Sequence, residues 1–129
     1  MAEPARKRIL VVDDASLVRM YYREALEAAG YEVDEALNGL EAMERLLSAP
    51  PALLIVDVNM PQMDGLTFLK VLRRQELPIS GTPALVISTE AKPQDREAAR
   101  AAGANYYLVK PVRPEVLTAY AALLTGRAA

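Results

Sequence analysis

Polar residues of the kinds that do chemistry follow short aliphatic runs at four separate places in this sequence. They are Asp13 and Asp14, Asp57, Ser88 and Thr89, and Lys110. A continuous aliphatic run of about four residues is typical of a strand that is buried on both faces of a parallel sheet. Ligands of such sheets bind beyond the carboxyl ends of the strands. We therefore expect the carboxylates, the hydroxyls and the lysine to meet at one edge of one sheet.

Carboxylates brought together in this way repel one another, so the site must hold a cation or a proton. Oxygen ligands without nitrogen or sulfur suit a hard ion, and a ligand set that keeps several waters suits Mg²⁺. Such an ion would neutralise the oxygens of a phosphoryl group in transfer, and one carboxylate could accept that group covalently. The lysine ammonium and a serine hydroxyl would bind the remaining phosphoryl oxygens. The residues thus indicate phosphoryl chemistry at a carboxylate.

The residue types that are missing exclude several other chemistries. The 129 residues include no cysteine and no histidine, which excludes disulfides, thiolate or imidazole metal sites, cysteine nucleophiles and a histidine phosphodonor within the chain. The charge is nearly balanced, with 15 basic and 17 acidic residues, so we expect no nucleic-acid binding. No apolar run approaches the ~18 residues of a membrane span, and residues 1–7 lack the apolar part of a signal peptide. We therefore expect no membrane insertion and a cytoplasmic location.

The hydrophobic periodicity alternates between a strand pattern and a helix pattern along the whole chain. The expected strands are Ile9–Val12, Tyr31–Ala36, Leu53–Val56, Ala84–Ile87 and Tyr106–Val109, and a helical pattern follows each of them. This alternation predicts an α/β fold, a doubly wound five-stranded parallel sheet with helices on both faces. We expect one domain over residues 8–125, between a flexible N-terminal segment at 1–7 and a frayed tail at 126–129.

Turn and cap residues mark where the helices begin. Ser16 is the expected N-cap of the first helix, Asn38 opens the second, and Asp64 with Gly65 forms a turn that caps the third. In the first helix, apolar residues at helical spacing predict the face that packs against the sheet. These residues are Leu17, Met20, Tyr21, Leu26 and Ala29. We expect this stripe to belong to the core.

Four fragments at the predicted strand ends resemble the receiver (response regulator) domain of bacterial two-component signalling, and especially its single-domain chemotaxis regulators. They are Val-Val-Asp-Asp at 11–14, Val-Asp-Val-Asn-Met-Pro-Gln-Met-Asp-Gly at 56–65, Ile-Ser-Thr at 87–89 and Val-Lys-Pro at 109–111. Each fragment alone is a weak signal, but four of them in order, each at a strand end, are specific. The resemblance extends from Arg8 to about Leu124 and implies the flavodoxin-like strand order 2-1-3-4-5.

The resemblance also implies roles for the clustered residues. Asp57 would accept a phosphoryl group from the phosphohistidine of a partner, either a sensor histidine kinase or a histidine phosphotransfer protein. Asp13 and Asp14 would hold Mg²⁺ together with Asp57 and the backbone carbonyl of Asn59. Lys110 would bind the carboxylate first and the phosphoryl group afterwards.

The same resemblance implies a switch that reports phosphorylation. Ser88 stands at the position of the switch hydroxyl and Tyr107 at that of the switch aromatic, which turns inward when the hydroxyl moves toward the phosphate. A cis peptide is expected before Pro111, where the family usually has one. The readout surface would be the face of the fourth helix, fifth strand and fifth helix, with candidate contacts Lys92, Arg96, Tyr107, Val109 and Tyr120. These residues also have simpler interpretations. Tyr107 could only pack beside Tyr106, and Lys92 and Arg96 could only form a solvated helix face.

We predict a stoichiometric phosphoacceptor with slow autodephosphorylation and not an enzyme. Phosphorylation would change its surface so that it binds a downstream effector protein. We expect a monomer or a phosphorylation-linked dimer. Two alternatives are a pseudo-receiver scaffold that binds proteins without phosphorylation, and a receiver fragment of a larger response regulator. A haloacid dehalogenase-type phosphatase also uses an aspartyl nucleophile, but it needs a carboxylate two positions later, where this chain has Asn59. A flavin carrier would want a loop rich in hydroxyls and glycine where this chain has Asp-Asp-Ala-Ser.

Thr89 departs from the family pattern, which commonly has alanine or glycine after the switch hydroxyl. We predict that its bulk restricts the access of water and lengthens the life of the aspartyl phosphate, so Thr89→Ala should speed phosphoryl loss. The measurement is the decay of the phosphorylated protein after the phosphodonor is removed, and an unchanged decay rate would contradict the prediction. A second reading stays open, in which Thr89 itself donates a hydrogen bond in place of Ser88.

Overall fold

The computed structural model describes residues 6–126, and all the predicted strand–helix units are present there. The strands are β1 (Arg8–Val12), β2 (Glu32–Ala36), β3 (Leu53–Val56), β4 (Ala84–Ser88) and β5 (Tyr106–Val109). The helices are α1 (Ser16–Ala28), α2 (Gly39–Ser48), α3 (Gly65–Arg73), α4 (Pro93–Ala102) and α5 (Pro114–Thr125), with a 3-10 turn η1 (Ile79–Gly81) before β4. Within residues 6–126, no helix has the length and apolar character needed to cross a membrane. Residues 1–5 and 127–129, which hold most of the predicted flexible segment and frayed tail, lie outside the described residues.

The strands form one parallel sheet in the order β2-β1-β3-β4-β5, as predicted. The central strands β1, β3 and β4 carry the continuous aliphatic runs because both of their faces are covered. The outer strands β2 and β5 are less buried. After β1 the chain goes to the edge at β2 and returns to β3, so the order reverses between β1 and β3. In sheets of this kind a ligand site is expected at that reversal.

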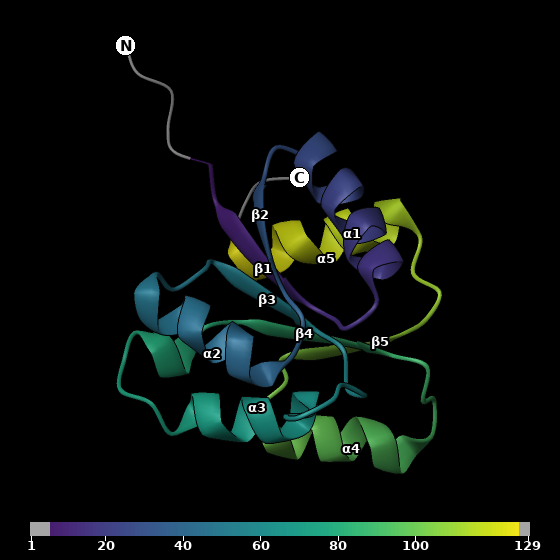
Figure 1. Cartoon of the computed structure of the whole chain (residues 1–129). Helices are drawn as coiled ribbons and strands as arrows, with labels where there is room; N and C mark the ends of the chain where they lie inside the picture. Colours follow the sequence, from purple (N-terminus) through teal and green to yellow (C-terminus); the bar gives the residue numbers. More distant parts are fainter. Residues whose placement is uncertain (1–5, 127–129) are drawn as a thin grey trace.

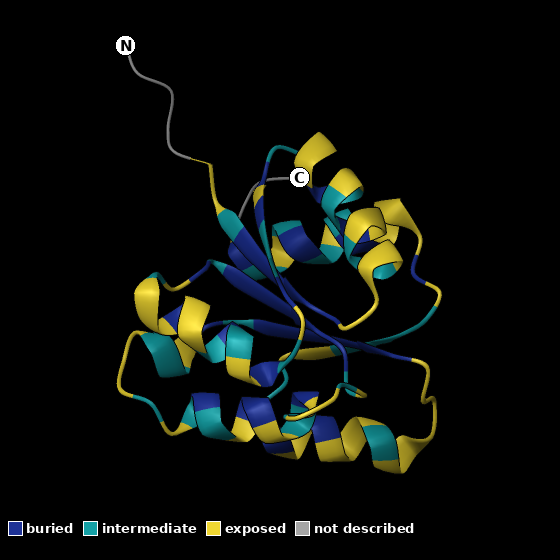
Figure 2. Cartoon of the chain, in the orientation of Figure 1, coloured by how far each residue is buried: buried dark blue, intermediate teal, exposed yellow. Residues whose placement is uncertain are grey.

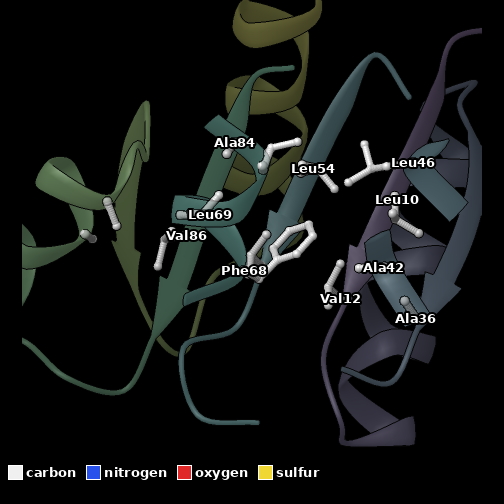
Figure 3. Close-up of a cluster of buried hydrophobic side chains, with 14 residues drawn as sticks. Leu10, Val12, Ala36, Ala42, Leu46, Leu54, Phe68, Leu69, Ala84 and Val86 are labelled. Carbon is white, nitrogen blue, oxygen red and sulfur yellow. The ribbon is translucent and has the colours of Figure 1, made fainter. Parts of the chain in front are cut away.

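Helices cover both faces of the sheet, with α1 and α5 on one side and α2, α3 and α4 on the other (Figure 1). Side chains alternate along β1, so Leu10 and Val12 belong to the core beneath α2 and α3, whereas Ile9 and Val11 face α1 and α5. Figure 3 shows the first of these cores, where Phe68 of α3 lies against the strands. Buried residues follow the strands and the inner helix faces, and exposed residues follow the outer helix faces (Figure 2). The sheet is therefore packed on both faces, and the ends of its strands carry the residues at its edges.

The predicted helix caps are correct for two helices and wrong for one. The side chain of Asn38 accepts a hydrogen bond from the N–H of Glu41 at 2.9 Å, and that of Asp64 accepts one from the N–H of Thr67 at 2.9 Å. Ser16, however, is the first residue of α1 and not its cap, and the alanine before it caps the helix without a side-chain hydrogen bond. The serine stands one position too late in the chain to serve the free N–H groups of the first turn.

The predicted core stripe of α1 is also wrong in its first half. Leu17, Met20 and Tyr21 are exposed, whereas Tyr22 and Leu26 are buried against the sheet. The helix is apolar on two faces, so its spacing alone does not identify the inner one. Packing against β1 and α5 selects the face that carries Tyr22, and this leaves an apolar strip of α1 in contact with solvent.

Candidate functional site

The carboxyl ends of four strands bring the predicted residues to one edge of the sheet. Asp13 and Asp14 directly follow β1, Asp57 follows β3, Ser88 ends β4, and Lys110 follows β5. The N–H of Asp57 donates to the carbonyl of Val12 at 2.9 Å, which extends the pairing of β1 and β3 by one residue. Asp13 and Asp57 therefore stand next to each other at the point where the strand order reverses.

The three aspartates form one cluster. Asp13, Asp14 and Asp57 each offer a carboxylate oxygen, and these oxygens all lie within 4.8 Å of one another. Asp13 is 1% and Asp57 8% exposed, while Asp14 is open to solvent. Burial raises the pKa of Asp57, and the charge of Asp13 raises it further, while Lys110 partly offsets both effects. Carboxylate oxygens this close, with no nitrogen or sulfur donor among them, fit a hard divalent cation such as Mg²⁺.

The ammonium group of Lys110 lies between two of these carboxylates. Its Nζ is 3.2 Å from Oδ2 of Asp13 and 3.4 Å from Oδ1 of Asp57. The N–H of Lys110 donates to the carbonyl of Ser88 at 2.8 Å, which continues the pairing of β4 with β5, and the peptide bond to Pro111 is cis, as expected. The lysine thus supplies the positive charge that lies between the two buried aspartates.

The predicted hydroxyl and carbonyl ligands lie at the same edge with different degrees of exposure. Ser88 is fully buried, and its Oγ accepts a hydrogen bond from the N–H of Glu90 at 3.1 Å. Thr89, one residue later, is exposed, and so is Asn59 in the loop between β3 and α3. The metal-ligand role of the Asn59 carbonyl and the role of Thr89 stay predictions.

Tyr107 packs with α4, and its neighbour Tyr106 packs with α5. The Tyr107 hydroxyl donates to the carbonyl of Glu90 at 2.7 Å, and the guanidinium of Arg96 lies 5.2 Å from the centre of its ring. The ring of Tyr106 meets that of Tyr120 edge to face, with 5.3 Å between the ring centres. Three of the five predicted surface residues, Arg96, Tyr107 and Tyr120, therefore line one groove on the face formed by α4, β5 and α5. The role of this surface in binding a partner stays a prediction.

Three residues shape the site in ways that the sequence patterns did not predict. Gly65 begins α3, and a Cβ at this position would lie 2.1 Å from the carbonyl oxygen of Asp57, so the helix starts directly against the backbone of that aspartate. The Asp-Gly pair signalled this turn, but only as a cap. Tyr22 is buried and lines the same pocket as Lys110, and its pKa is raised by burial and by the charges of Asp13 and Asp57. Arg19 donates to the carbonyl of Asp13.

A parallel sheet in this order, with an acidic pair after the first strand, an aspartate after the third and a lysine after the fifth, defines the receiver class of signalling domains. Comparison with known proteins agrees: the chain matches the response regulator receiver domain family over residues 9–122. The chain belongs to this family.

Its relatives include both single-domain and larger proteins. The chain is 41% identical over 112 residues to chemotaxis protein CheY1 of Helicobacter pylori, a match that covers 85% of this chain and 90% of that protein. It is 43% identical to a protein-glutamate methylesterase/protein-glutamine glutaminase of Archaeoglobus fulgidus, with 81% of this chain matching 30% of that protein. It is 37% identical to transcriptional regulatory protein PrrA of Mycobacterium leprae, with 95% of this chain matching 52% of that protein. The solved structure of chemotaxis protein CheY4 of Vibrio cholerae has a TM-score of 0.86 at 37% identity, covering 93% of this chain and 99% of that one.

The close approach of α3 to Asp57 gives a prediction about Gly65. In an ordinary first helical turn, Gly→Ala stabilises, but here the new Cβ would collide with a backbone oxygen, so Gly65→Ala should lower the free energy of unfolding by about 2 kcal/mol or more. Gly81→Ala is the matched control, because its Cβ would meet only a Leu77 side-chain atom at 3.4 Å, and it should be nearly neutral. The measurement is urea unfolding of both variants. Equal midpoints would show that the contact at Asp57 is not tight.

Proposed function

We propose that this chain is a phosphorylation-dependent signalling switch that accepts a phosphoryl group on Asp57. One observation supports this most: the nearly buried Asp57 carboxylate lies within 4.8 Å of oxygens of Asp13 and Asp14, and its Oδ1 is 3.4 Å from the Lys110 ammonium. A nucleophile, the ligands for a cation and a cationic ligand for a phosphoryl oxygen are thus together. Membership of the receiver family supports the same reading.

In the proposed transfer, an oxygen of Asp57 attacks the phosphorus of a phosphohistidine. The new O–P bond forms as the N–P bond breaks, and the imidazole nitrogen leaves with the electron pair. The chain has no histidine, so the phosphohistidine belongs to a partner, a sensor histidine kinase or a histidine phosphotransfer protein. Lys110 then pairs with a phosphoryl oxygen. Water removes the group slowly, so the chain is a stoichiometric acceptor and not an enzyme that turns over a metabolite.

Asp13, Asp14 and Asp57 would hold Mg²⁺, with the backbone carbonyl of Asn59 as a further ligand. When bound, the ion neutralises charge on the oxygens of the transferring group. Asp13 is already oriented for this role, because its Oδ1 accepts a hydrogen bond from the N–H of Ala15 at 2.9 Å and its Oδ2 is paired with the lysine.

The proposed output lies on the face of α4, β5 and α5. This face has a groove of about 360 Å³, whose lining includes Arg96, Arg100, Asn105, Tyr106, Tyr107 and Tyr120. Tyr107 also lines a smaller cavity of about 40 Å³. On phosphorylation, the Ser88 hydroxyl turns to the phosphoryl group, and Tyr107, which is partly buried against the core, turns further inward. The groove then changes shape where an effector protein binds, with Lys92 and Val109 as further contacts.

The acceptor assignment is tested with Mg²⁺ and acetyl phosphate as the phosphodonor. The intact protein should gain the mass of one phosphoryl group, and Asp57→Asn should abolish this gain because an amide oxygen is a poor nucleophile. Asp64→Asn is the matched control, since Asp64 is an exposed cap of α3 and asparagine caps equally well. That variant should be phosphorylated as fully as the unmodified protein, and so should Ser88→Ala.

Two outcomes would contradict the proposal. A mass gain that survives Asp57→Asn would move the acceptor to another residue. A folded protein that gains no phosphoryl group, even with excess donor and Mg²⁺, would favour the pseudo-receiver alternative.

A further inference from the structure

One arginine of α1 reaches the backbone of the acidic pair. Arg19 is only 11% exposed in its side chain. Its Nη1 donates to the carbonyl oxygen of Asp13 at 2.7 Å, and its Nε donates to Oε1 of Glu35 at 2.8 Å. A single rigid guanidinium thus joins α1, the end of β1 and the end of β2.

The carbonyl that Arg19 holds belongs to the peptide group between Asp13 and Asp14. Because a peptide group is planar, the direction of this oxygen also sets the position of the Asp14 Cα. The N–H of Asp13 on the other side donates to the carbonyl of Ala36 at 3.1 Å. The backbone of Asp13 is therefore held from β2 on one side and by Arg19 on the other.

Glu35 is the anchor of this arrangement. Burial would raise its pKa, but hydrogen bonds from Arg23 and Arg19 outweigh burial and hold the pKa of Glu35 below its ordinary value. Arg23 donates to the other oxygen, Oε2, at 2.8 Å, and it also pairs with Glu27. Arg23 is 34% exposed in its side chain. The two arginines thus share an anchor, but the contact with the acidic pair is made by Arg19.

We propose that Arg19 is a positioning residue for the Mg²⁺ site, because it fixes the peptide group from which the carboxylates of Asp13 and Asp14 project. This inference rests on the proposed function, in which that pair holds the ion. Arg19 affects the affinity for Mg²⁺ in two opposite ways. As a positive charge near the cluster, Arg19 repels a divalent cation, so its loss would tighten Mg²⁺ binding. As the holder of the peptide group, its loss would weaken binding.

The experiment measures the dissociation constant of Mg²⁺ by isothermal titration calorimetry for the unmodified protein, Arg19→Met and Arg23→Met. Both variants lose one positive charge and one hydrogen bond to Glu35. Arg19→Met also loses the contact with Asp13, whereas Arg23→Met loses the exposed pair with Glu27. Arg19→Met should raise the dissociation constant about tenfold, the size of effect typical for residues that orient metal ligands. Arg23→Met should change it by less than about twofold, as expected for a partly exposed ion pair.

Arg19→Lys and Arg23→Lys keep the charge and form a second matched pair, which decides the question if Arg19→Met does not fold. A lysine cannot hold Asp13 and Glu35 in the fixed fork geometry of arginine, so Arg19→Lys should still raise the dissociation constant at least twofold over Arg23→Lys. The proposal is overturned if the Arg19 variants bind Mg²⁺ as tightly as their Arg23 counterparts, or more tightly.

An unmodified protein that binds no Mg²⁺ would overturn this inference and the proposed function together. Normal Mg²⁺ binding by the unmodified protein, with equal dissociation constants for the Arg19 and Arg23 variants, would overturn this inference alone.

Discussion

The repulsion among Asp13, Asp14 and Asp57 is the constraint on which the rest of the structure depends. Their oxygens lie within 4.8 Å of one another at the edge of an apolar sheet, where burial strengthens the repulsion. Burial raises the pKa of Asp57, the neighbouring charge of Asp13 raises it further, and Lys110 only partly offsets these effects. Parallel strands in the order β2-β1-β3-β4-β5 are what bring these groups together, and the two cores on the faces of the sheet keep them there.

The cluster has excess negative charge, so a ligand that changes this charge changes the electrostatic energy of the site. Hydrogen bonds and side-chain contacts connect the cluster with the α4–β5–α5 face. Lys110, which touches two of the carboxylates, is also hydrogen-bonded through its N–H to the carbonyl of Ser88. Three residues before it on β5 is Tyr107, which is held by Glu90 and covered by Arg96. The edge of the sheet and the α4–β5–α5 face are therefore connected through the short strand β5, which ends beside Lys110 and carries Tyr107.

Much of the fold and of the site could be predicted from the sequence because both depend on local patterns. Aliphatic runs that end in Asp13, Asp57 or Lys110 identify the strands and also their functional ends. The inner face of α1 could not be predicted, because Leu17 and Tyr22 lie on two apolar faces and only tertiary packing selects one. Arg19 and Arg73 could not be predicted for a related reason. Arg73 donates to the carbonyls of Thr82 and Gly103, and no sequence spacing encodes a hydrogen bond to a distant backbone oxygen.

The central claim is that unbalanced negative charge at the cluster costs stability until a cation arrives, and thermal unfolding with and without Mg²⁺ tests it most directly. Without divalent cations, the free energy of unfolding of Asp57→Asn should exceed that of the unmodified protein by about 1 kcal/mol. This magnitude is ordinary for a single substitution, but most substitutions destabilise a protein. Added Mg²⁺ should stabilise the unmodified protein more than the variant, because ligand binding to the folded state raises its stability. Asp64→Asn should not stabilise the protein, because a hydrogen bond from the Thr67 N–H favours the charged form of Asp64 and lowers its pKa. A destabilised Asp57→Asn in the absence of Mg²⁺ would contradict the claim.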